Sequence, residues 1–207
     1  MSQTIRIQER IRHPDYKPPS QYHDIAILRL EKEATYNVFV RPACLPVDWP
    51  DVGQNDKAVA TGWGSVDWSD DKGSDNLLKV TLNLVPHQSC NTSFFDDDFI
   101  DHDYLHRFAQ GIVNEWQICA GKMFVLGKDI CQNICKQRRI DRIYSLLFKS
   151  GSGGPLAIFN TVHLCMYTII GVNSLEQICG SDIMPGVYTR VYYYIPWIER
   201  TAWPEYF

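Results

Sequence analysis

The sequence lacks long hydrophobic runs, positive charge in excess and a leader-like start. Its best apolar run, Leu164–Val172, ends at about half of the roughly 18 residues that a membrane helix needs. Its 20 Lys and Arg residues are outnumbered by 24 Asp and Glu, for a net charge of -4, which argues against a nucleic-acid-binding protein. The first ten residues, MSQTIRIQER, contain no apolar core of a signal peptide. With 45% hydrophobic and 21% charged residues, the chain is also not a disordered one.

Closely paired cysteines of the zinc-binding kind are absent as well. Only Cys131 and Cys135 lie near each other, and no second close His or Cys pair completes a tetrahedral site. Spread cysteines in a chain punctuated by Gly and Pro indicate disulfides and an oxidising, extracellular compartment. Two features conflict with that interpretation: the start is not leader-like, and the cysteine count is odd. The seven cysteines are Cys44, Cys90, Cys119, Cys131, Cys135, Cys165 and Cys179.

What is present is a series of short strands separated by turns. The compact apolar run 24–30 predicts a buried strand, and the alternation over 80–85 predicts a half-buried one. Residues 168–174 and 186–191 are further strand candidates, and 61–64 (TGWG) is a turn signal. Pro196 predicts a short closing helix with proline at its first position. The pattern as a whole favours an all-β sandwich or barrel.

One segment departs from the rest of the chain. Residues 133–149 carry five Lys and Arg residues against a single acid, Asp141. A basic island in an acidic chain could bind an acidic partner, but a stretch foreign to the fold is the simpler interpretation, since natural domains are consistent across levels. We therefore predict one domain over residues 1–207 with an atypical insertion at 133–149.

Residues 151–155 (GSGGP) form the sharpest local motif. Glycines on both sides of Ser152 allow a tight turn that exposes the hydroxyl, and backbone N–H groups there can face a developing oxyanion. The motif alone could be a plain turn, but several other motifs occur with it in a fixed order along the chain. The accompanying stretches are 23–30 (HDIAILRL), 41–46 (RPACLP), 61–64, 117–121 (QICAG), 128–132 (KDICQ) and 185–191 (PGVYTRV).

Together these motifs identify the chain as resembling the trypsin/chymotrypsin-like serine proteases, and most closely the snake-like branch of the arthropod clip-domain proteases. The resemblance runs along nearly all of the chain except 133–149. It implies a fold of two packed six-stranded β-barrels, the first of them incomplete here. It also implies a hydrolytic reaction that needs no metal or cofactor, with a protein substrate or inhibitor as partner and no role for nucleic acid or membrane.

The resemblance assigns roles residue by residue. Asp24 matches the triad aspartate and Ser152 the nucleophile, with the N–H groups at Ser150 and Ser152 forming the oxyanion hole. Asp129 matches the acid that selects Arg or Lys side chains at the bottom of the specificity pocket. Ser174 and Gly186 match the pocket-wall serine beside Asp24 and the wall glycine. Implied disulfides are Cys90–Cys119 and Cys131–Cys179, while Cys44 matches a cysteine that ties such domains to an upstream clip or light-chain segment.

Three departures from the family pattern bear on activity. None of the histidines, His13, His23, His87, His102, His106 and His163, matches the triad histidine, which lies upstream of Asp24 in the family. Ser150 and Gly151 stand where the family has Gly-Asp, and that aspartate orders the oxyanion hole after zymogen cleavage. Glu176 and Ile178 alter the pocket rim. His23 adjoins Asp24, but alternation along a strand would point their side chains to opposite faces.

Two hypotheses remain open at this point. In the first, the chain belongs to a secreted serine endopeptidase that cleaves after Arg or Lys, and is inactive as written because its sequence is incomplete or mis-spliced. In the second, it is a non-catalytic protease homologue that acts as a binding or regulatory module. The acidic run Asp96–Asp98 lacks the pattern of a calcium loop and is expected to be a solvated loop. The run Tyr192–Tyr194 is expected to pack on the barrel rather than against a ligand.

Overall fold

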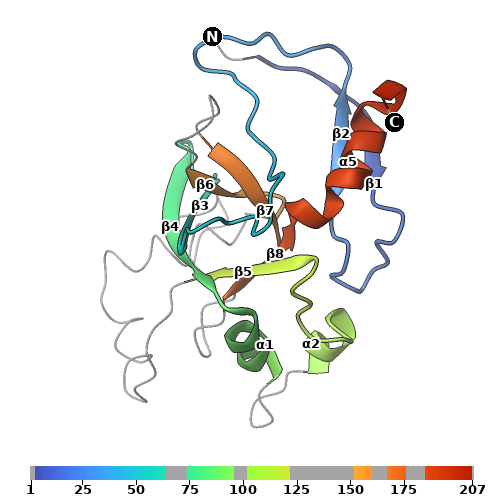
Figure 1. The fold of residues 1–207 in the computed structure, drawn as a ribbon. Helices are drawn as coiled ribbons and strands as arrows, with labels where there is room; N and C mark the ends of the chain where they lie inside the picture. Colours follow the sequence, from blue (N-terminus) through green and yellow to red (C-terminus); the bar gives the residue numbers. More distant parts are fainter. Residues whose placement is uncertain are drawn as a thin grey trace.

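The structure is a computed structural model of the 207-residue chain and describes residues 3–63, 74–95, 102–121, 152–159, 167–175 and 185–206. The Asp96–Asp98 run and the basic segment 133–149 lie outside these ranges. Within them the chain is mainly β, with a six-stranded closed barrel, a separate two-stranded hairpin and a C-terminal helix (Figure 1).

The barrel closes in the strand order β3-β4-β5-β8-β7-β6. Its antiparallel strands are β3 (Lys57–Gly62), β4 (Leu78–Val85), β5 (Gln117–Gly121), β6 (Pro155–Phe159), β7 (Tyr167–Leu175) and β8 (Gly186–Arg190). Alternate side chains point inward, as in β4, where Val80 and Leu82 are buried and Thr81 is exposed. Closure leaves no free edge in this part of the molecule.

Two apolar clusters fill and flank the barrel. The inner cluster includes Leu82, Ile118, Leu156, Ile170 and Tyr188, all nearly inaccessible to solvent. The second cluster packs α1 (His87–Phe95) and α2 (His102–Arg107) below β5, as Figure 1 shows. The predicted disulfide Cys90–Cys119 is confirmed and ties α1 to β5, with a Cα–Cα distance of 6.3 Å.

The hairpin consists of β1 (Ile7–Arg12) and β2 (Ala26–Leu30). The sequence predicted a buried strand over 24–30, and this prediction is wrong for β2. Leu28 is 52% exposed and Leu30 40%. In the register, Leu28 lies opposite Arg10 and Leu30 opposite Ile7. The hairpin forms a sheet of its own among the described strands, so no second β-layer covers the face that carries these leucines. The two-barrel expectation is therefore met by one complete barrel and this hairpin.

The chain ends in η1 (Val191–Tyr194), helix α5 (Ile195–Ala202) and η2 (Pro204–Tyr206). The closing helix is thus confirmed, but it begins one residue before Pro196, which occupies its second position rather than its first. Figure 1 shows α5 beside the β1–β2 hairpin, so the C-terminus lies next to strands from the N-terminal part. None of the helices described here is long and apolar enough to cross a membrane.

Candidate active site

Asp24 lies at the junction between the hairpin and the barrel, two residues before β2. The preceding His23 has a φ of +57°, in the left-handed region that is uncommon for residues other than glycine. This turn sends the two side chains apart: His23 Nδ1 lies 2.9 Å from the Tyr194 hydroxyl, whereas the Asp24 carboxylate faces Ser174. The expected divergence of His23 and Asp24 is present, although a turn and not strand alternation produces it.

Ser174 donates a hydrogen bond to Asp24 Oδ2 at 2.7 Å. The strand register explains its direction. Opposite β8, Asn173 pairs with Tyr188 and Leu175 with Val187, so Ser174 is an extra residue without a partner in the ladder. Such a bulge re-aims a side chain. The backbone of Asp24 is held as well, because the Thr189 hydroxyl of β8 donates a hydrogen bond to the Asp24 carbonyl oxygen at 2.7 Å.

Ser152 lies in an exposed turn just before β6. The turn is clamped to β7 by two backbone hydrogen bonds, from Gly153 N to Asn173 O at 2.8 Å and from Asn173 N to Gly154 O at 2.9 Å. Gly153 has a φ of +81°, which glycine adopts without strain. An added Cβ at Gly153 would meet no atom within 4 Å, so backbone conformation and not space requires this glycine.

These bonds attach the Ser152 turn and Asp24 to two consecutive residues of β7, Asn173 and Ser174. Ser152 adjoins Gly153, which is bonded to Asn173, and the next residue, Ser174, is bonded to Asp24. Burial raises the pKa of Asp24 above its usual range, while the Ser174 hydrogen bond opposes the rise. The serine thus favours the ionised carboxylate, the form that can accept a hydrogen bond from an imidazolium.

Three of the four histidines whose side chains are described contact other groups, and the fourth is exposed. His13 stacks on His23 with ring centroids 5.4 Å apart. His87 Nε2 faces the Ile112 carbonyl, and His106 is exposed on α2. The His102 side chain and all of His163 lie outside the described residues. No described histidine is hydrogen-bonded to Asp24.

Other predicted site residues are placed only in part. Asp129, Ser150, Cys131 and Cys179 lie outside the described ranges. Gly186 is buried at the start of β8, where an added Cβ would lie 3.2 Å from the Tyr188 ring and 3.5 Å from the Ala120 carbonyl oxygen. Close packing within the barrel is therefore sufficient to require this glycine. Across the part of the chain that the structure describes, no three His, Cys, Asp or Glu residues gather as a metal site.

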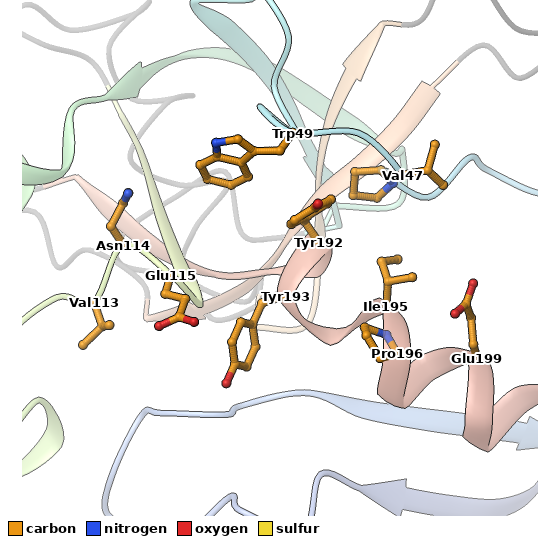
Figure 2. A pocket seen from close by; sticks show the side chains of 11 residues that line it. Val47, Trp49, Val113, Asn114, Glu115, Tyr192, Tyr193, Ile195, Pro196 and Glu199 are labelled. Carbon is orange, nitrogen blue, oxygen red and sulfur yellow. The ribbon is translucent and has the colours of Figure 1, made fainter. Parts of the chain in front are cut away.

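The structure also contains a feature that the sequence analysis missed. A cavity of about 910 Å³ lies beside η1 and α5, and two of the three tyrosines in the 192–194 run line it (Figure 2). Tyr194 is buried as expected, but Tyr192 is only half-buried and Tyr193 is 38% exposed. The length of the tyrosine run could have indicated this, because three consecutive side chains in a tight helix cannot all face one core.

Comparison with known proteins identifies the family. The family model described as Trypsin matches residues 1–133 and 147–198. The chain belongs to the trypsin family. The residues between the two matched ranges fall within the segment predicted to be an insertion.

Relatives of this trypsin-like domain include arthropod and human proteases. It is 33% identical to serine protease snk of Drosophila melanogaster over 205 residues, which cover 98% of this chain and 40% of that protein. It is 33% identical to the phenoloxidase-activating enzyme of Bombyx mori over 208 residues, covering 97% and 40% respectively. It is 30% identical to human transmembrane protease serine 11B, covering 94% and 39%. The chain thus spans about two fifths of the length of these relatives.

A solved structure shares the fold. The structure titled "Structure of GrC" superposes with a TM-score of 0.66 at 28% sequence identity, covering 97% of this chain and 70% of that chain. The chain is therefore a trypsin-like serine protease domain in sequence and in architecture.

Proposed function

We propose that the chain is part of a serine endopeptidase in which Ser152 is the nucleophile and Asp24 orients the general base. The observation that supports this assignment is the set of hydrogen bonds that joins the Ser152 turn, Asn173, Ser174 and Asp24 on one strand end. Attack by the Ser152 hydroxyl on a carbonyl would form an acyl-enzyme and release the amine product, and water would then hydrolyse the ester. Backbone N–H groups at Ser150 and Ser152 would bind the oxyanion.

We further propose that the substrate is a protein cleaved after Arg or Lys outside the cell. The proposal rests on Asp129 as the pocket acid and on Ser174 and Gly186 as pocket walls, by resemblance to the family. The Cys90–Cys119 disulfide fits an oxidising compartment. A role in an extracellular zymogen cascade would follow from the likeness to the arthropod clip-domain proteases.

Residues 1–207 by themselves are proposed to be inactive. Ser152 needs a general base to remove its proton, and no histidine in the described ranges is hydrogen-bonded to Asp24. Gly151 cannot form the ion pair that the family's aspartate makes after activation. Ser150 stands where the family has a glycine whose N–H is an oxyanion donor, and losing one such donor costs on the order of 10²–10³ in rate.

An Arg-amide chromogenic substrate tests these proposals. We expect residues 1–207 to hydrolyse it no faster than the Ser152→Ala variant. Hydrolysis that Ser152→Ala abolishes would contradict the predicted inactivity. Where a transcript of the same gene encodes an upstream histidine motif and joins Gln132 to Gly-Asp-Ser, its product should cleave after Arg. In that product Asp24→Asn should lower kcat by on the order of 10⁴-fold.

A non-catalytic homologue is the second candidate function. Gly151, Glu176 and Ile178 favour it, because all three replace residues that the family uses at the nucleophile loop or the pocket rim. A transcript in which another residue replaces the upstream histidine would support this candidate. The proposed link from Cys44 to an upstream segment would require disulfide exchange, since Cys44 is already disulfide-bonded in the structure.

A further inference from the structure

The cavity beside α5 is built from residues other than those placed in the candidate active site. Trp49 comes from the segment after Cys44, Tyr192 and Tyr193 from η1, Glu115 from the loop before β5, and Glu199 from α5 (Figure 2). The remaining lining residues are mostly apolar: Pro46, Val47, Val113, Asn114, Ile195 and Pro196. The cavity therefore combines aromatic walls with two acidic side chains.

The aromatic rings are accessible and held in place. Trp49 is 57% exposed, and its ring centroid lies 5.5 Å from that of Tyr192 at an interplanar angle of 48°. Tyr193 packs against Trp116 with centroids 5.6 Å apart. Trp49 and Tyr193 are thus held by neighbouring rings, and part of each ring remains exposed to solvent. Exposed ring faces attract cations through the ring quadrupole.

Trp49 already lies against one guanidinium. Arg190 Cζ is 5.2 Å from the Trp49 ring centroid. That charge is not available to the cavity, because Arg190 Nη1 is paired with Asp51 Oδ1 at 2.7 Å and both side chains are nearly inaccessible. Arg190 also donates to Asn114 Oδ1 at 3.2 Å, which connects the Trp49 wall to the loop that carries Glu115.

The two carboxylates remain without compensation. Among the ion pairs of the described residues, none includes Glu115 or Glu199. An anionic ligand would meet both negative charges, and a purely apolar ligand would have to strip water from them at a cost in free energy. A cation with a flat face suits both the aromatic and the acidic parts of the lining.

We propose that this cavity binds an arginine side chain presented by a basic segment of a partner protein. Guanidinium fits better than ammonium, since its plane stacks on aromatic rings while its edge pairs with a carboxylate. The proposal does not depend on whether the chain is catalytic.

The test uses ¹⁵N-labelled full chain and the peptide N-acetyl-Arg-Arg-amide, with N-acetyl-citrulline-citrulline-amide as the uncharged probe. The Trp49 indole N–H resonance, assigned by its absence in Trp49→Phe, reports on the cavity itself. We expect the arginine peptide to shift this resonance saturably and the citrulline peptide to leave it in place. Binding at the proposed specificity pocket is removed by repeating the titration in the Asp129→Asn background.

The carboxylates are tested by the combined Glu115→Gln and Glu199→Gln variant. It should bind the arginine peptide about tenfold more weakly at the Trp49 resonance. The matched control Glu205→Gln changes an exposed glutamate in η2 that does not line the cavity, and it should bind as the unmodified chain does. The proposal is overturned if the citrulline peptide shifts Trp49 equally, if the double variant binds with unchanged affinity, or if no shift occurs.

Discussion

At the scale of single residues, Arg190 and Asp51 form a buried ion pair next to Trp49, which lines the cavity. The exposed fraction is 8% for the Arg190 side chain and 0% for Asp51. Burial raises the pKa of Asp51 and lowers the pKa of Arg190, and the attraction between the two charges opposes both shifts. Asp51→Asn would leave a buried guanidinium uncompensated, so we expect the free energy of unfolding to fall by about 3–5 kcal/mol.

Urea unfolding of Asp51→Asn measures this loss. The double variant Asp51→Leu with Arg190→Met removes both charges and should recover most of the stability, because no unpaired charge remains. A double variant as unstable as Asp51→Asn would mean that packing, and not charge, explains the effect.

Which residues could be predicted depended on whether local sequence carried the signal. Asp24 and Ser152 lie in motifs that the resemblance could align, and the structure places the Ser174 hydroxyl in hydrogen-bond contact with Asp24. Arg190 and Asp51 are 139 residues apart in sequence, and although Arg190 lies in the 185–191 motif, nothing local to either residue indicates that they pair. The positive φ of His23 could not be predicted either, because residues other than glycine seldom adopt a positive φ and no sequence pattern indicates one here.

At the scale of elements, a cluster of rings joins the end of β1 to the C-terminal helix. His13 stacks on His23 and meets the edge of Trp197 in α5 at 4.9 Å and Tyr194 at 5.1 Å. Burial, and then the neighbouring His23, lower the pKa of His13 below 6.5, while Asp15 opposes the shift. The folded state therefore binds a proton at His13 less readily than the unfolded state.

It follows that His13 makes stability fall as the pH drops from about 7 through the unfolded-state pKa of about 6.5. The stability is retained at higher pH, where His13 is neutral in both states. His13→Phe keeps the ring but cannot be protonated, so its melting temperature should depend less on pH than that of the unmodified chain between about pH 7.5 and 5.5. Thermal melts in that range provide the measurement. An identical slope in both proteins would assign the pH dependence to other groups.

Elements were predictable where the sequence alternated, as in β4, or was rich in strand-forming residues, as in β8, whose residues are all buried. Alternation in 80–85 and the apolar content of 168–174 and 186–191 correspond to β4, β7 and β8. The run 24–30 was predicted to be buried because it is apolar, but burial depends on what packs against a strand. That information lies in other segments, and in the described residues β2 pairs only with β1. The bulge at Ser174 likewise could not be predicted from the β7 sequence alone, because it depends on how β7 pairs with β8.

At the scale of the whole molecule, a closed barrel is joined to a hairpin that pairs with no other strand in the described ranges. A two-stranded sheet is marginally stable alone and offers unpaired N–H and C=O groups to other chains. Its outer face adds Ile7, Leu28 and Leu30, which are between 40% and 52% exposed. Burying this face against a second copy would remove apolar surface from water. We therefore expect residues 1–207 to self-associate through the hairpin.

Light scattering after size-exclusion chromatography tests this expectation. Leu28→Lys combined with Leu30→Lys places charge on the outer face of β2, where association would bury it, and should raise the monomer fraction. Leu77→Lys is the matched control, since Leu77 is 55% exposed but precedes β4 on the barrel, and it should associate like the unmodified chain. Equal effects of both changes would indicate that a lysine at any exposed leucine raises the monomer fraction, and that the hairpin face is not the interface. A monomeric unmodified chain would show that the hairpin face is stable in water and would contradict the expected self-association.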